Sequence, residues 1–200
     1  MNRIVSSLVF AAGMLATSAF AATTTYRAHL SGPAEAVPVF SPGYGVSTIV
    51  IDDVANTLQL STDFSWLTSP TVAAHIHAGT DQPLLGTAGV AVPANELPLG
   101  VTAGAFSVTY NLLDASTYTP GYWDSNGGTA EGARDSLIAD LNTGRAYFNI
   151  HTVQYPGGEI RGFYIPSPVP EPGTYAMLMV GLAGVGFAAA RSKRKQEEVA

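Results

Sequence analysis

The chain has 200 residues, of which 46% are hydrophobic and only 12% are charged, and it carries a net charge of −6 with no cysteine. The lack of cysteine excludes disulfides, thiolate metal ligands and thiol nucleophiles. Between residues 22 and 168 the chain has four arginines, twelve acidic residues and no lysine, a net charge of −8, which argues against nucleic acid and anionic membrane surfaces as partners.

The first 21 residues have the pattern of a secretory signal peptide. Arg3 precedes an apolar stretch at residues 8–15, and residues 19–21 have the small-x-small pattern of a signal peptidase site. The apolar stretch is shorter than the roughly 20 residues that span a bilayer, so a retained anchor is the weaker alternative. We therefore expect residues 1–21 to be removed and residues 22–168 to form one exported domain.

Within this domain, apolar and polar residues alternate with a period of two in several stretches bounded by Gly, Pro, Asn or Asp. This alternation predicts half-buried antiparallel strands. Leu137, Ile138 and Leu141 predict one short helix that ends near Gly144, while residues 119–128 have the composition of a loop. Strands are predicted at residues 24–30, 46–51, 58–66, 72–77, 106–112, 146–151 and 159–165. The expected fold class is therefore all-β, a β-sandwich or Greek-key barrel.

Two of the four histidines, His75 and His77, stand two places apart in one predicted strand. Side chains at i and i+2 of a strand point to the same face, so both imidazoles can reach one ion. On this pattern Val72, Ala74 and Ile76 face the core. The pair is therefore a candidate for two ligands of a metal site.

His151 is the candidate third ligand, because the same alternation places it on the outward face of its strand together with Tyr147 and Asn149. Three neutral imidazoles with an open fourth position suit one Zn²⁺ or Cu²⁺ ion, and Asp81 or Glu159 are candidate oxygen donors nearby. The alternative is a structural cluster in which the histidines hydrogen-bond to backbone and loop groups.

A polar cluster of Asn149, Glu159 and Arg161 is predicted beside the third histidine. Glu159 and Arg161 share a face of the last strand. We expect an ion pair between these two side chains, or a hydrogen bond from them to the neighbouring loop.

The last 32 residues combine three features of a sorting signal. Pro170, Glu171 and Pro172 are followed by an apolar run at residues 175–190. A basic cluster then predicts a cytoplasmic end; it consists of Arg191, Lys193, Arg194 and Lys195. A run of 16 apolar residues with three glycines is marginal for a stable span, which favours a temporary transmembrane helix.

Residues 169–200 resemble the PEP-CTERM sorting signal of Gram-negative bacteria. The resemblance implies that a membrane-embedded exosortase recognises the Pro-Glu-Pro motif while residues 175–190 anchor the chain transiently in the inner membrane. It also implies removal of the tail and transfer of the domain to the cell surface or extracellular matrix, typically in bacteria that make exopolysaccharide.

Three stretches of the domain resemble the CHRD domain, the module first described in chordin: residues 29–45, 73–80 and 145–164. The most specific part is Asn-Ile-His-Thr at 149–152 followed by Pro-Gly-Gly-Glu-Ile-Arg-Gly at 156–162. Ala36 and Val37 depart from the family pattern, as does a longer aromatic loop at 118–124. The resemblance implies an immunoglobulin-like β-barrel related in shape to copper/zinc superoxide dismutase, with no known catalysis.

The function expected from these features is that of an exported, non-enzymatic binding or structural module at the cell surface. Its expected partners are the exosortase and then exopolysaccharide or another surface protein. The alternative is a mononuclear copper or zinc protein that uses His75, His77 and His151, with superoxide-dismutase-like redox chemistry as one form. A purely structural domain that associates with copies of itself is a third reading.

Overall fold

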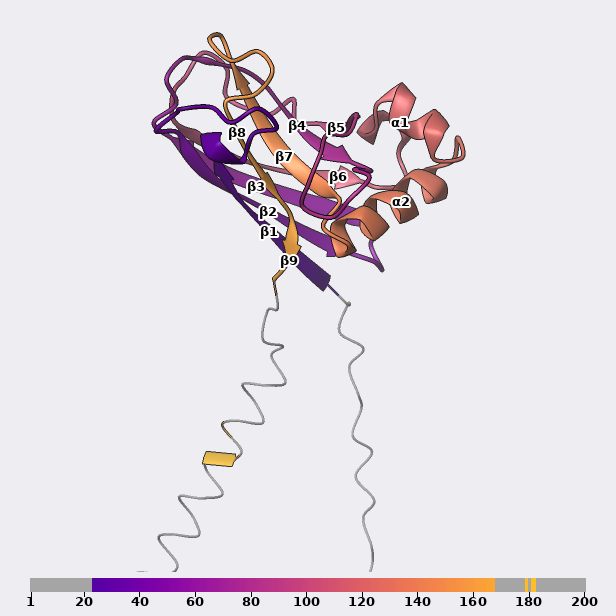
Figure 1. The fold of residues 1–200 in the computed structure, drawn as a ribbon. Coiled ribbons are helices and arrows are strands. Elements are labelled where there is room, and N and C mark those ends of the chain that lie inside the picture. Colours follow the sequence, from indigo (N-terminus) through magenta and orange to yellow (C-terminus); the bar gives the residue numbers. More distant parts are fainter. Residues whose placement is uncertain (1–22, 168–178, 180, 183–200) are drawn as a thin grey trace, which may run out of the picture.

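The computed structural model describes residues 23–167 together with 179, 181 and 182. Nine strands lie in this part of the chain: β1 (Thr23–Ser31), β2 (Tyr44–Asp52), β3 (Thr57–Ser65), β4 (Thr71–Ala78), β5 (Val90–Pro93), β6 (Gly104–Asn111), β7 (Ala146–Thr152), β8 (Ile160–Phe163) and β9 (Ile165–Pro166). They form one antiparallel sheet in the order β5-β4-β7-β8-β1-β2-β3-β6, with β9 paired to β1. The sheet curls into a half-barrel (Figure 1), which confirms the expected all-β class.

The expected signal peptide, the Pro-Glu-Pro motif and the basic cluster lie outside the described residues, as does most of the apolar run at 175–190. No helix in the described part of the chain is long and apolar enough to cross a membrane. Among the described residues, all the strands and all the buried hydrophobic side chains fall between Thr23 and Pro166.

The interior of the half-barrel is filled by alternate side chains of the strands, as the period of two requires. The largest fully buried side chains include Phe64, Phe148 and Tyr164. The Tyr164 hydroxyl would be costly to bury alone, but it hydrogen-bonds to Ser47 Oγ at 2.6 Å. The two edge strands also approach each other, since the Tyr110 hydroxyl of β6 donates to the carbonyl of Pro93 in β5 at 3.2 Å.

Two helices close one end of the half-barrel, α1 (Pro120–Ser125) and α2 (Ala130–Asn142) (Figure 1). The second is the expected helix. Its N-cap Thr129 accepts from the amide of Gly132 at 3.1 Å, and its inward face consists of Ala133, Leu137 and Leu141. The first lies in the segment expected to be a loop. A proline in the first turn and a threonine N-cap, Thr119, explain why these six residues are helical.

The seven expected strands are all present, but β5 and β9 were not anticipated as separate strands. The four residues of β5 lie between prolines and glycines, and they are extended because β4 supplies a partner along one edge. The expectation for Val72 is wrong: its side chain is 44% exposed. A register shift between Thr71 and Ala73 interrupts the alternation, so that Thr71 is buried in its place.

The β8 strand lies so close to β1 that only glycine fits at position 162. A Cβ atom added there would come within 2.2 Å of the carbonyl oxygen of His29. We expect Gly162→Ala to lower the free energy of unfolding of residues 22–168 by about 1–3 kcal/mol, measured by urea denaturation. The matched control is Gly157→Ala, where an added Cβ has no neighbour within 4 Å. Equal stability of the two variants would contradict this packing constraint.

Candidate metal centre

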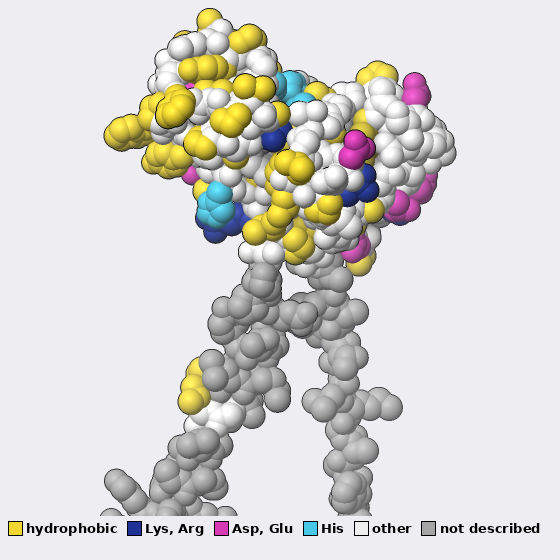
Figure 2. All heavy atoms as spheres, in the orientation of Figure 1, with side chains coloured by type: hydrophobic (Ala, Val, Ile, Leu, Met, Phe, Trp, Pro, Cys, Tyr) yellow, Lys and Arg dark blue, Asp and Glu magenta, His cyan; other side chains and the backbone are white. Residues whose placement is uncertain are grey.

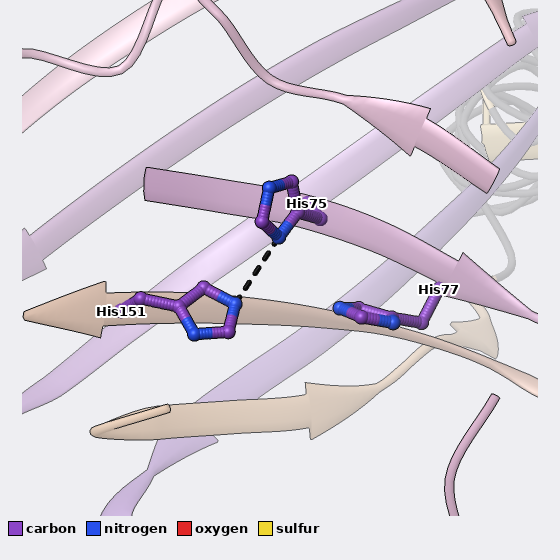
Figure 3. Close-up of side chains that lie close together, drawn as sticks. All are labelled: His75, His77 and His151. Atoms are coloured by element: carbon purple, nitrogen blue, oxygen red, sulfur yellow. Dashed lines mark hydrogen bonds between the residues drawn. The ribbon is translucent and has the colours of Figure 1, made fainter. Parts of the chain in front are cut away.

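Three histidines meet on the face of β4 and β7 that points away from the barrel interior (Figure 3). In β4, His75 and His77 alternate with the buried Ala74 and Ile76. In the pairing of β4 with β7, residue 73 lies opposite His151 and His75 lies opposite residue 149. His75 and His151 are therefore diagonal neighbours on one face, within reach of each other across the two strands.

The ring nitrogens of the three histidines are close enough to share an ion. One nitrogen from each ring lies within 4.8 Å of the other two. His75 Nδ1 and His151 Nε2 are 3.1 Å apart (Figure 3). Nitrogens that bind one tetrahedral ion at about 2.0–2.1 Å lie about 3.3 Å from each other. The spacing of these two nitrogens is therefore close to that of two ligands of the same ion.

Backbone carbonyls set the tautomers of two of the rings. His77 Nδ1 lies 2.9 Å from the carbonyl oxygen of Ala88, and His151 Nδ1 lies 2.9 Å from that of Pro156. A carbonyl oxygen can only accept, so each Nδ1 carries the proton and each Nε2 has a free lone pair. The Nε2 atom of His77 is buried and has no hydrogen-bond partner among the described residues.

This arrangement is typical of metal-binding histidines, in which the nitrogen that does not bind the ion donates to a carbonyl or carboxylate. Without an ion, the free lone pair of His151 Nε2 accepts from His75 Nδ1. With an ion, both nitrogens could turn their lone pairs toward it, and the unpaired Nε2 of His77 would gain a partner. The residues present therefore fit a bound ion.

An aromatic stack holds the His77 ring in its plane. The ring is parallel to that of Tyr147, with an angle of 2° between the planes and 4.6 Å between the centroids. The Tyr147 ring also contacts a cation: the guanidinium carbon of Arg161 lies 5.0 Å from the centroid of this ring. The same carbon lies 5.4 Å from the centroid of the Phe163 ring. A cation over aromatic rings is attracted to them. The orientation of His77 thus depends on side chains from β7 and β8.

The outward face of β7 is itself covered by loops. Tyr147 and Asn149 were expected to point outward, and they do share the face of His151, but they are only 4% and 3% exposed. Arg161 holds two of these loops against the sheet, because its guanidinium group donates hydrogen bonds to the carbonyl oxygens of Ala34 and Gly86. The histidines therefore lie between the sheet and a layer of loops, and not on an open surface.

The expected polar cluster is only partly assembled. Asn149 donates to the Oε1 atom of Glu35 at 2.7 Å, and Arg161 Nε lies 4.0 Å from the Oε2 atom of the same carboxylate. Burial raises the pKa of Glu35 to about 7, although Arg161 and Asn149 act in the opposite direction. Gly158 allows this arrangement, since a Cβ there would come within 2.4 Å of the Asn149 amide nitrogen.

Glu159 lies apart from Arg161 and does not form the expected ion pair with it. Its carboxylate accepts from Ser41 Oγ at 2.6 Å, from the Thr68 amide at 2.6 Å and from Thr152 Oγ1 at 2.7 Å. Burial opposes ionisation, but these hydrogen bonds lower the pKa of Glu159 overall. The bond to Thr68 corresponds to the alternative expectation of a contact with a neighbouring loop.

The cluster of possible metal ligands in the described part of the chain consists of the three histidines alone. Asp81 and Glu159, the two candidate oxygen donors, do not belong to it. Glu35 and the carbonyl groups of Ala88 and Pro156 could not be identified as part of this site from the sequence pattern. Glu35 lies in one of the stretches that resemble the CHRD domain, which was the signal that could have drawn attention to it.

Two family models match the chain. The model described as the CHRD domain matches residues 26–164, and the model described as the PEP-CTERM protein-sorting motif matches residues 168–195. Searches of curated proteins and of solved structures return no match. The domain match includes all three histidines, as well as Glu35, Asn149 and Arg161.

Burial favours the neutral form of all three histidines. It lowers the pKa of His75 to about 4, with further contributions from the neighbouring imidazoles of His151 and His77. It also lowers the pKa of His77 and of His151. Neutral imidazole is the form that binds metal ions. At neutral pH the three side chains are therefore ready to coordinate an ion without losing protons.

These shifts predict how stability depends on pH in the metal-free domain. A histidine in the unfolded chain has a pKa of about 6.5, so below that pH the unfolded state takes up more protons than the folded state. The stabilising contribution of His75 is complete above about pH 6.5 and decreases as the pH falls toward 4. Urea denaturation between pH 7.5 and 4.5, with a chelator present, should show a smaller loss of stability in His75→Gln than in the native chain. Parallel curves for the two proteins would contradict the shift.

Proposed function

The chain belongs to the CHRD domain family, and we propose that it is a non-enzymatic surface module that binds one copper or zinc ion through His75, His77 and His151. It carries a PEP-CTERM signal, and is thus an exported protein whose tail is processed by an exosortase. The metal site was the alternative in the sequence analysis. It becomes the main proposal because of one observation, the buried and unpaired Nε2 atom of His77 beside the other two rings.

The choice of metal follows from the ligands. Three imidazoles without a carboxylate suit Zn²⁺ or Cu²⁺, whereas Ca²⁺ and Mg²⁺ bind to oxygen. Three protein ligands leave a fourth position for water or for a group of a partner. The negative charge of the domain also favours the approach of a cation.

The role that we propose for the ion is to brace the outer layer of the domain. His77 donates a hydrogen bond to the carbonyl oxygen of Ala88 in one loop, and His151 donates one to the carbonyl oxygen of Pro156 in a turn. An ion held by both rings and by His75 would connect β4, β7 and these two loops at one point. Exopolysaccharide or another surface protein as the partner of the module stays a prediction.

Elemental analysis of purified residues 22–168 tests the metal site. After exposure to Zn²⁺ or Cu²⁺ and removal of excess ion, the native domain should retain about one ion per chain and should melt at a higher temperature than the metal-free domain. His77→Ala and His151→Ala should lose both effects, because each removes a ligand.

The matched control for the metal site is His29→Ala, since His29 is exposed and is not part of the cluster. This variant should retain the ion. Substoichiometric metal in the native domain, or equal loss of metal in His29→Ala, would rule out the proposed centre.

Cell fractionation tests the sorting signal separately. In a strain that possesses the sorting enzyme, the native chain should accumulate as a shortened form at the cell surface or in the medium. Replacing Pro170, Glu171 and Pro172 with alanine should leave a full-length chain in the inner membrane, because the recognition motif is lost. Glu197→Ala, which changes the tail beyond the basic cluster, serves as the control and should be processed normally. A native chain that stays uncut in the inner membrane would refute the sorting assignment.

A further inference from the structure

A candidate interaction surface lies at the end of the half-barrel that the helices leave open. Four loops meet there: residues 32–43 between β1 and β2, 66–70 between β3 and β4, 94–103 between β5 and β6, and 153–159 between β7 and β8. The described chain starts at Thr23 at the opposite end and leaves there through β9 (Figure 1). Neither end of the domain therefore obstructs these loops.

Six large hydrophobic side chains at this end project into solvent. Trp66 is 69% exposed and Phe40 is 102% exposed. At about 200 Å² for a whole aromatic side chain, the three aromatic members alone expose about 450 Å². An exposed apolar patch of more than a few hundred Å² marks an interaction site. We call these six side chains the apolar end (Figure 2); they are Val37, Phe40, Tyr44, Trp66, Leu99 and Val153.

Hydrogen bonds join the four loops into one surface. Glu159, in the last loop, accepts from Ser41 Oγ of the first loop and from the Thr68 amide of the second, both at 2.6 Å. The amide of Leu67 donates to the carbonyl oxygen of Thr102, in the third loop, at 3.0 Å. A surface that is already ordered loses little conformational entropy when a partner docks on it. The apolar end is therefore prepared for binding.

The backbone at Trp66 is held in an unfavourable conformation. Its φ is 63°, in the left-handed region where a bulky residue is rarely found. Strain of this kind is concentrated at functional sites, where the surrounding structure maintains it. The exposed ring of Trp66 gains little from the domain itself in return for this strain. Both observations point to a partner that covers the ring.

The charges favour a second copy of this chain as that partner. The four loops contain no lysine or arginine, and two of their three carboxylates, Glu35 and Glu159, are buried. The third, Glu96, accepts from the Tyr110 hydroxyl beside the other end of β6. Residues 22–168 have a net charge of −8, so two copies repel each other wherever their acidic faces meet. An anionic membrane or a charged polymer would find no opposite charge on these loops.

The same end offers a groove as well as a projecting ring. A pocket of about 510 Å³ lies between residues 35–40 and 154–158, and its wall includes Val39, Tyr155 and Pro156. In a two-fold symmetric dimer, each copy must carry both halves of the contact on one surface. Trp66 belongs to neither of the two segments that form the groove. Each copy can therefore present its ring to the partner while receiving the partner's ring.

We propose that the protein forms a symmetric dimer through the apolar end, with Trp66 of each copy entering the groove of the other. A standard interface takes about 800 Å² from each partner. The exposed aromatic area is below this value, so we expect a dimer with a Kd on the order of 10 µM. The two chain exits then lie at the far ends of the dimer.

Three substitutions test the apolar end. Trp66→Asn removes the ring, and asparagine tolerates the left-handed conformation better than tryptophan does. This variant should unfold at the same or a higher urea concentration while its dimer is weakened about tenfold or more, whereas loss of a merely structural tryptophan would lower stability. Phe40→Asp places like charges in the contact, and Gly157→Leu fills the groove at a position where an added Cβ has no neighbour within 4 Å.

The measurement is sedimentation velocity of the processed protein or of residues 22–168, from about 1 to 300 µM with a chelator present. The native chain should change from monomer to dimer. Added NaCl should strengthen the association, because it screens the repulsion between two acidic copies. The three variants should need about tenfold higher concentrations. The matched control is Val54→Ser, which removes a side chain that is 74% exposed at the opposite end and should dimerise like the native chain.

Three results would overturn the dimer. They are a monomer at every concentration, a dimer that persists unchanged in Trp66→Asn and Phe40→Asp, and a monomer that uses Trp66 to bind phosphatidylcholine vesicles or dextran. The last result would assign the apolar end to a lipid surface or to a polysaccharide. Because the chelator removes any bound ion, failure of the dimer and failure of the metal centre are distinguishable.

Discussion

The antiparallel pairing of β4 with β7 is the constraint on which the proposed site depends. It sets residue 73 opposite His151 and His75 opposite Asn149, so the three imidazoles converge on one face. A shift of this register by one residue would turn every side chain of one strand to the other face. The two strands then hold the rings together without any covalent or ionic link between them, and the interior packing of Ile76 and Phe148 keeps the strands in place.

A second layer over this face turns a cluster of histidines into a candidate binding site. Arg161 connects the covering loops through the carbonyls of Ala34 and Gly86, and it lies over the ring of Tyr147 that stacks on His77. The layer does not seal the site, because all three histidines are only half-buried, and some histidine side chains are visible at the surface in Figure 2. The covering loops also supply the backbone carbonyls of Ala88 and Pro156, which fix the tautomers of His77 and His151.

The strands and the spacing of His75 and His77 could be predicted because each follows from local alternation. That His151 lies next to these two residues could not be predicted in the same way, because alternation within a strand does not reveal which strands are neighbours in the sheet. The prediction that Val72 faces the core was wrong because a register shift between paired strands leaves no trace in the alternation of polar and apolar residues. The carboxylate that pairs with Arg161 belongs to Glu35 and not to Glu159. Glu35 lies in a segment rich in proline and glycine, whose sequence has no periodic pattern from which its position could be predicted. Such contacts between a loop and a distant strand depend on the completed fold.

The exit of the chain from the domain limits how its tail can be cut. The amide of Ser167 still donates to the Thr25 carbonyl, and Pro170 follows only three residues later, a reach of about 10 Å at full extension. A sorting enzyme that acts at this motif would therefore meet its substrate close to the β9 end of the folded domain. The exposed side chains of Val37 and Phe40 lie in the segment between β1 and β2, at the other end of β1, and stay clear of this exit.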